Sequence, residues 1–136
     1  MNFAQVSWPF NNTYKTSLNS YWSAQEEALT PTCIYSPTNA NQVAQAVAAL
    51  SKGGCQFAVR SGGHTPNAGA ANIDTDVTID LSGLNQISLS SDNTLASVSP
   101  GQRWGAVYTQ LAQYGVAIAG GRGSSIGVGG LTLGGT

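Results

Sequence analysis

Residues 32–60 place a helical segment between two short apolar runs, and this order limits the fold more than any other feature of the sequence. The apolar runs are TCIYS at 32–36 and QFAVR at 56–60. Residues 38–52 between them favour a helix, because Asn39 can cap its start and apolar side chains recur on one face. These apolar side chains are Val43, Ala46, Val47 and Leu50. Strand, helix and strand in succession predict a βαβ unit with a parallel pair of strands.

The chain after this unit predicts one more strand, a hairpin and a second helix. Residues 76–82 alternate in polarity, which is typical of a half-buried strand. Its core side would carry Val77, Ile79 and Leu81, and its solvated side Asp76, Thr78 and Asp80. The runs 86–90 and 94–99 predict a hairpin, because Ser91, Asp92 and Asn93 can form the turn between them.

The second helix is expected over residues 103–114, and a weaker one in the first 30 residues. Apolar side chains at helical spacing predict the inner side of helix 103–114. They are Trp104, Val107, Leu111 and Tyr114. Residues 1–30 predict an irregular arm and a weak helix that would bury Leu18, Tyr21 and Trp22.

The scarcity of charge excludes some classes of partner. Only 8% of the 136 residues are Asp, Glu, Lys or Arg, and the net charge is −1, whereas soluble proteins average about 25% charged residues. Nucleic acid is not expected as a partner, since its binding depends on clustered Lys and Arg. No apolar run is long enough to span a membrane. The length predicts one modest domain.

Three further features bear on the compartment in which the protein works. The first residues, MNFAQVSWPFNN, have neither the basic nor the apolar region of a secretory leader. Cys33 and Cys55 flank the predicted helix and could form a disulfide between neighbouring strands; two buried free thiols are the alternative. Asn11 begins a glycosylation sequon, Asn11-Asn12-Thr13. A disulfide and a glycan would both agree with a secreted protein.

Two glycine-rich loops are expected after short strands. The first covers residues 61–69, and the second covers 120–130 after the short apolar run 116–119. Glycine lets the main chain approach a ligand and turn successive N–H groups toward it, which suits phosphate groups. Neither loop has the lysine of a nucleotide-hydrolysing phosphate loop, and neither is a G-x-G-x-x-G sequence that opens directly into a helix. Simple turn formation is the alternative.

The glycine-rich tail after residue 115 is expected to need a partner. Counted from Gly115 onward it contains nine glycines and few side chains that could pack, and such a stretch is costly to order. Further chain or a ligand would compensate for this cost.

His64 is the only histidine of the chain and stands in the first of these loops. A lone loop histidine is usually solvated or caps a turn. A zinc site would need three or four ligands, which the chain does not offer at suitable spacing. Asp74, Asp76 and Asp80 resemble a calcium loop only in part, because Ile79 stands where its glycine is required. A catalytic serine is not indicated either. The remaining hypothesis is that His64 attaches a ligand held by the glycine loops.

Four stretches together resemble a known family. They are FAVRSGGHTPNAGAANID, VTIDLSGLNQI, SVSPGQRWGAVYTQL and AGGRGSSIGVGGLTLGG, in this order. The chain from residue 31 onward resembles the PCMH-type FAD-binding domain of berberine-bridge-enzyme-like oxidases, within the vanillyl-alcohol-oxidase superfamily. The resemblance implies an α+β fold with an N-terminal βαβ subdomain and the start of a second mixed α/β subdomain. It also implies that residues 1–30 precede the domain and that the domain, residues 31–136, is incomplete.

The resemblance assigns roles to particular residues. It implies that His64 bonds covalently to the 8α-methyl group of FAD. The first diphosphate loop would comprise Arg60, Ser61, Gly62, Gly63 and Thr65. The cofactor tunnel would be lined by Pro100 and Gly101. The second loop would comprise Gly123, Ser124, Ser125, Gly127, Gly129 and Gly130. Relatives with a doubly attached flavin carry a cysteine where this chain has Gly123, so a single bond through His64 is expected.

The resemblance also implies an activity, which depends on chain that is absent here. An oxidoreductase of this family would take hydride from a carbon bearing oxygen or nitrogen in a small molecule and pass the electrons to oxygen. No catalytic acid or base is assigned to residues 1–136, and a second polypeptide is expected to supply the rest of the flavin and substrate sites. Two alternatives stay open: a redox-neutral cyclase or isomerase of the same fold, and a non-catalytic module.

Overall fold

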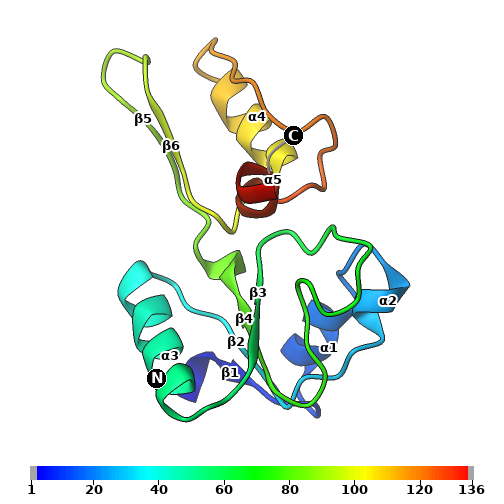
Figure 1. The fold of residues 1–136 in the computed structure, drawn as a ribbon. Helices are drawn as coiled ribbons and strands as arrows, with labels where there is room; N and C mark the ends of the chain where they lie inside the picture. The colour runs from blue at the N-terminus through cyan, green and yellow to red at the C-terminus, as the bar shows by residue number, and fades with distance from the viewer. Residues whose placement is uncertain (1–2, 135–136) are drawn as a thin grey trace.

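The computed structural model describes residues 3–134, which form two lobes (Figure 1). The first lobe contains a four-stranded sheet in the order β1-β2-β4-β3. Its strands are β1 (Val6–Ser7), β2 (Cys33–Tyr35), β3 (Phe57–Arg60) and β4 (Val77–Asp80). β1 pairs antiparallel with β2, and the other pairs are parallel. The second lobe contains a hairpin of β5 (Ile87–Leu89) and β6 (Ala96–Val98), with helices α4 (Trp104–Ala112) and α5 (Val128–Gly134). Short 3-10 helices lie at Phe3–Gln5 and Leu81–Gly83.

The predicted βαβ unit is present, but its two strands are not neighbours. Helix α3 (Ala40–Lys52) begins after Asn39, whose side chain accepts a hydrogen bond from Gln42 N. β4, which follows much later in the chain, lies between β2 and β3 and pairs with both. The prediction of a directly paired β2 and β3 is therefore wrong, because the strand order is set by long-range pairing with β4.

The position of β4 also overturns the predicted disulfide. Cys33 and Cys55 are both free, the first half-buried and the second exposed. Equivalent positions on β2 and β3 are two strand spacings apart, about 9–10 Å, whereas a disulfide needs Cα atoms within about 7 Å of each other. Burial raises the pKa of the Cys33 thiol above its ordinary value.

The two faces of the sheet differ in chemistry. Helix α3 covers one face, where Tyr35, Ala46, Leu50 and Ile79 form an apolar core. The other face is covered by α1 (Asn12–Leu18) and α2 (Ala24–Glu27). Thr78 and Asp80 face this second layer and are 0% and 5% exposed. The predicted solvated face of β4 is therefore wrong, because the polar side chains are buried against residues from the N-terminal segment.

The N-terminal segment packs against the sheet mainly through two tyrosine side chains. Tyr14 and Tyr21 are buried, while Leu18 is only partly buried. Trp22 is 60% exposed, so the prediction that it is buried is wrong. Asn11 is exposed and caps α1, accepting a hydrogen bond from Thr13 N at 2.8 Å.

The second lobe has its own small core. Trp104, Val107 and Leu111 of α4 are buried together with Val128 of α5. Tyr114, predicted on the inner side of α4, is 56% exposed because the helix ends at Ala112. Residues 116–119 form no strand, and the predicted second glycine loop ends where α5 begins. Among the described residues, no helix is long and apolar enough to cross a membrane.

Candidate functional site

The two glycine-rich loops touch each other. A Cβ atom added at Gly62 would overlap the backbone of Gly127, and one added at Gly127 would overlap the backbone of Gly62. Ser61 joins the same place to a third segment: its Oγ donates to Pro100 O at 2.6 Å and accepts from Gly129 N at 3.1 Å. Glycine is therefore required at both contact positions, because any side chain would separate the loops.

A cavity of about 500 Å³ opens beside this contact. Most of the residues that the sequence assigned to a cofactor line it: Ser61, Gly62, Gly63, His64, Thr65, Pro100, Gly127, Gly129 and Gly130. The rest of the wall is apolar and was missed by the sequence analysis: Val59, Ala70, Ala71, Leu81, Ile126, Leu131 and Leu133. All of these apolar residues except Leu81 lie within the glycine loops or within three residues of them in the chain, which is the pattern that could have indicated them.

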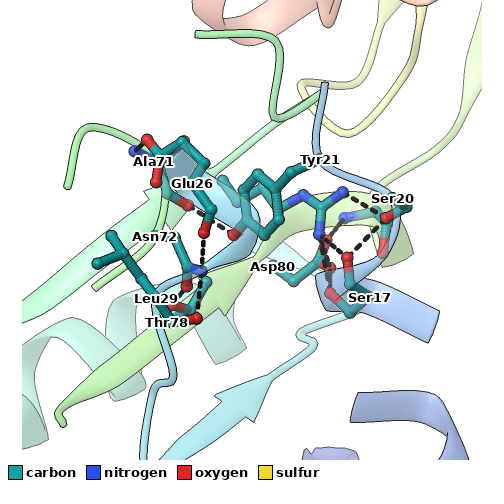
Figure 2. A network of polar contacts seen from close by, with 11 residues as sticks. Ser17, Ser20, Tyr21, Glu26, Leu29, Ala71, Asn72, Thr78 and Asp80 are labelled. Carbon is teal, nitrogen blue, oxygen red and sulfur yellow. Dashed lines mark hydrogen bonds and ion pairs between the residues drawn. The ribbon is translucent and has the colours of Figure 1, made fainter. Parts of the chain in front are cut away.

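Arg60 does not line this cavity, although the sequence assigned it to the first loop. Side chains alternate along β3, so Val59 and Ser61 face the cavity while Arg60 points to the other face of the sheet. Its guanidinium donates to Ser17 O at 2.7 Å and to Ser20 Oγ at 2.6 Å, and lies 3.7 Å from Asp80 Oδ2. Arg60 thus ties α1 and the turn after it to the ends of the parallel strands. Figure 2 shows its partners Ser17, Ser20 and Asp80 gathered there.

The other assigned residues outside the cavity hold the turns around it. A Cβ atom at Gly101 would overlap Leu81 O, so only glycine fits there. Ser124 O accepts from Gly105 N at 3.0 Å and Ser125 O accepts from an Arg103 guanidinium nitrogen at 2.9 Å. Gly123 lies against the Ile126 side chain. The hydrogen bonds of Ser124 and Ser125 hold the second loop against the start of α4.

A second, polar cavity of about 430 Å³ lies at the carboxyl ends of the sheet strands. Arg60, Asp80, Gly101 and Arg103 contribute to its wall together with several hydroxyl side chains. Burial, and then the positive charge of Arg60, lower the pKa of Arg103 from its ordinary value. The two cationic side chains in this wall are therefore close enough to repel each other.

A buried polar network holds the far end of the first glycine loop (Figure 2). Glu26 is fully buried, and its Oε1 accepts from Ala70 N at 3.0 Å and Ala71 N at 2.7 Å. The Tyr21 hydroxyl donates to Ala71 O at 2.8 Å. Asn72 donates to Glu26 O at 2.8 Å and accepts from the Thr78 hydroxyl at 2.8 Å. Sequence analysis missed this use of Tyr21, Glu26 and Asn72, because residues far apart in the chain give no local pattern.

Tyr21 also supports the near end of the loop. Its ring lies 3.9 Å from the Arg60 guanidinium and directly under Gly63, where an added Cβ atom would come within 2.9 Å of the ring. Gly63 has a φ of +64°, a conformation that other residues rarely adopt. Burial raises the pKa of Tyr21 far above its ordinary value of 10.0, so its hydroxyl stays a neutral donor.

His64 stands at the wall of the cavity and stacks on Trp22. The ring centroids are 4.8 Å apart and the planes are 18° apart. The backbone N–H of Trp22 donates to Gly63 O at 2.9 Å. Within residues 3–134, no hydrogen bond to the imidazole is present, and no group of three or more His, Cys, Asp or Glu side chains could hold a metal ion. The stack is therefore the main contact that orients the ring.

These features fit a flavin dinucleotide. Backbone N–H groups of glycines can approach a diphosphate closely, and the apolar wall suits a flat aromatic ring system. Ser61 is already engaged by Pro100 and Gly129, so it serves to hold the loops together. The residues that would contact the cofactor are the glycines, His64 and the apolar wall.

The comparisons with known proteins agree with this site. Residues 31–136 match the family described as the FAD binding domain. The chain is 41% identical over 133 residues to the FAD-dependent monooxygenase sdcF of Emericella nidulans, an alignment that covers 96% of this chain and 28% of that protein.

Two solved structures have the same fold. The first, 6-hydroxy-D-nicotine oxidase from Arthrobacter nicotinovorans, matches with a TM-score of 0.80 and 27% identity over 90% of this chain and 26% of that one. The second, BBE-like 1 of Physcomitrella patens, matches with a TM-score of 0.76 and 25% identity over 92% of this chain and 27% of that one. The chain thus spans just over a quarter of the length of these proteins. The resemblance to berberine-bridge-enzyme-like flavoproteins is confirmed, and the chain belongs to the FAD-binding domain family.

Proposed function

We propose that this chain forms the first part of the flavin site of an FAD-linked oxidoreductase and that His64 carries the flavin covalently. The observation that carries the proposal is the position of His64 in the wall of a cavity where two glycine loops meet. FAD would supply the hydride acceptor for oxidation of a small molecule at a carbon bearing oxygen or nitrogen. The relatives named FAD-dependent monooxygenases and oxidoreductases support this class of activity.

In this proposal each group of residues has one task. The backbone at Gly62, Gly63, Gly127 and Gly129 would hold the diphosphate, and the apolar wall would exclude water from the ring system. His64 would form a bond from an imidazole nitrogen to the flavin 8α-methyl carbon. Forming that C–N bond would replace one C–H and one N–H bond, and molecular oxygen would accept the two electrons and two protons released, giving hydrogen peroxide.

The remaining parts of the flavin and substrate sites would come from polypeptide outside this chain. Leu133 lines the cavity yet is 90% exposed, which supports further protein packing against it. Native purification should yield this chain joined to or associated with a larger partner; a stable, flavin-loaded monomer of this chain alone would contradict this. We also propose secretion with a glycan at exposed Asn11, which a mass decrease after glycosidase treatment would test.

The covalent bond is tested by intact-mass measurement of the denatured natural protein. The wild type should carry the mass of one FAD less two hydrogens, and His64→Ala should carry none while still binding FAD non-covalently. Covalent flavin retained in His64→Ala would overturn the proposal. A protein that binds no FAD at all in wild-type form would overturn the assignment of the cavity as well.

A further inference from the structure

We infer that Trp22 is a positioning residue for flavin attachment, holding the His64 imidazole in the orientation that bond formation needs. This inference rests on the proposed covalent role of His64. Trp22 lies outside residues 31–136, the part of the chain that matches the FAD-binding domain family. Its role therefore follows from the contacts of this chain.

Most of the Trp22 side chain is open to solvent in this chain, and its aromatic ring contact is the stack with His64. Its side chain is 60% exposed, although a large aromatic side chain gains most from being buried. One face of the indole ring instead lies against the His64 imidazole, with ring centroids 4.8 Å apart and ring planes 18° apart. The exposed position is thus used for a contact with one specific side chain.

The backbone around Trp22 is also fixed at both ends of the first loop. Trp22 N donates to Gly63 O at 2.9 Å. On one side, buried Tyr21 lies under Gly63 and bonds Ala71 O; on the other, Glu26 bonds the N–H groups of Ala70 and Ala71. The indole is therefore carried by the same short segment that sets the path of the loop, so the backbone positions of Trp22 and His64 are held relative to each other.

Attachment depends on the orientation of the imidazole. Within the part of the chain that the structure describes, the imidazole has no hydrogen bond, and its one aromatic ring contact is the stack with the indole. Attachment requires an imidazole nitrogen to meet the flavin methyl carbon in a narrow geometry. Stacked aromatic pairs contribute on the order of 0.5–1.5 kcal/mol, which corresponds to about a two- to tenfold change in the population of the aligned ring.

The test compares Trp22→Leu with Trp22→Phe in the natural protein. Each variant is made flavin-free in a host that cannot synthesise riboflavin, and FAD is then added under air. Covalent attachment is followed by intact mass after denaturation, and non-covalent binding by quenching of flavin fluorescence. Trp8→Leu is the matched control, because Trp8 is a second tryptophan that is 51% exposed and lies away from the cavity.

Trp22→Leu should slow attachment about two- to tenfold, with FAD affinity unchanged. Trp22→Phe, which keeps an aromatic ring, should restore most of the rate, and Trp8→Leu should match the wild type. Attachment by Trp22→Leu at the wild-type rate would overturn the inference. So would failure of Trp22→Phe to recover the rate, or loss of FAD binding in Trp22→Leu, since either result would indicate a purely structural role.

A parallel His64→Ala sample separates this inference from the proposed function. If His64→Ala still acquires covalent flavin, the proposed attachment site is wrong and Trp22 has no imidazole to position. If His64→Ala acquires none and Trp22→Leu behaves as the wild type, the attachment site stands and only the role of Trp22 fails.

Discussion

The two glycine loops meet at one point but are held there by different means. The first loop, residues 61–71, is fixed by buried side chains from the N-terminal segment: Tyr21 bonds Ala71 O, and Glu26 bonds the N–H groups at its far end. The second, residues 120–127, is fixed by its sequence neighbour α4. Tyr108 donates to Gly121 O at 2.8 Å, and Gly120 lies tightly against the ring of Trp104.

This difference separates local from long-range support. Glu26 is 44 and 45 residues from its partners Ala70 and Ala71, whereas Tyr108 is 13 residues from Gly121. The shape of the first loop therefore depends on contacts with a segment that is distant in the chain. The second can form as soon as α4 folds, because closing a short loop costs less entropy. The loop that carries His64 is thus the one that depends on the whole first lobe.

The largest expected effect comes from parting the two loops. Gly62→Ala would place a methyl group on the backbone of Gly127, and backbone cannot move aside as a side chain can. We expect a loss of more than about 4 kcal/mol in the free energy of unfolding, as for severe overpacking. Denaturant titration of the FAD-bound protein measures it.

The control is Gly134→Ala, at the end of α5, where an added Cβ atom meets nothing within 4 Å. This change should alter stability by less than about 1 kcal/mol. A Gly62→Ala protein as stable as Gly134→Ala would mean that the two loops are not in contact, and the comparison between them would lose its basis.

The next effect should be confined to the first loop. Glu26→Ala removes the acceptor of the buried Ala71 N–H and leaves the Ala70 N–H with only its 3.3 Å hydrogen bond to Asn67 O. An unsatisfied buried N–H costs about 1–3 kcal/mol. We expect a loss of about 2–3 kcal/mol, with faster hydrogen exchange at these two amides and no change at Gly105. Glu26→Gln keeps one acceptor oxygen and should lose only about 1 kcal/mol. If hydrogen exchange rose equally at the amides of Ala71 and Gly105, the two loops would not be held by separate sets of contacts.

The same contrast explains what the sequence could and could not predict. Helix α3 was predicted because Asn39 and the apolar face are local features. The insertion of β4 between β2 and β3 was not, because strand order depends on pairing between distant residues. Alternation in β4 revealed a polar face, yet only the folded N-terminal segment shows that Thr78 and Asp80 are buried.

For the site, the glycines were predictable and their supports were not. Glycine runs mark a close approach of backbone, and Gly62, Gly63 and Gly127, which were predicted to hold a cofactor, line one cavity. Arg60 was assigned to it as well, but the alternation of β3 turns it away. Tyr21, Trp22 and Glu26 carry no motif, because their function is defined only by what they contact after folding.

The smallest expected effect comes from removing the hydroxyl groups of the two tyrosines that hold the loops, Tyr21 and Tyr108. Tyr21→Phe and Tyr108→Phe each remove one hydrogen bond to a loop carbonyl, and each should cost about 1 kcal/mol at pH 7. Tyr21→Phe should also change the stability at alkaline pH. Because burial raises the pKa of Tyr21 above 10.0 in the folded state, the unfolded chain loses this proton first, and stability falls as pH rises past about 10, by up to about 1.4 kcal/mol per pH unit. Tyr21→Phe should remove that part of the slope, measured by denaturant titration between pH 9 and 11; an unchanged slope would mean that Tyr21 does not hold the first loop from a buried position.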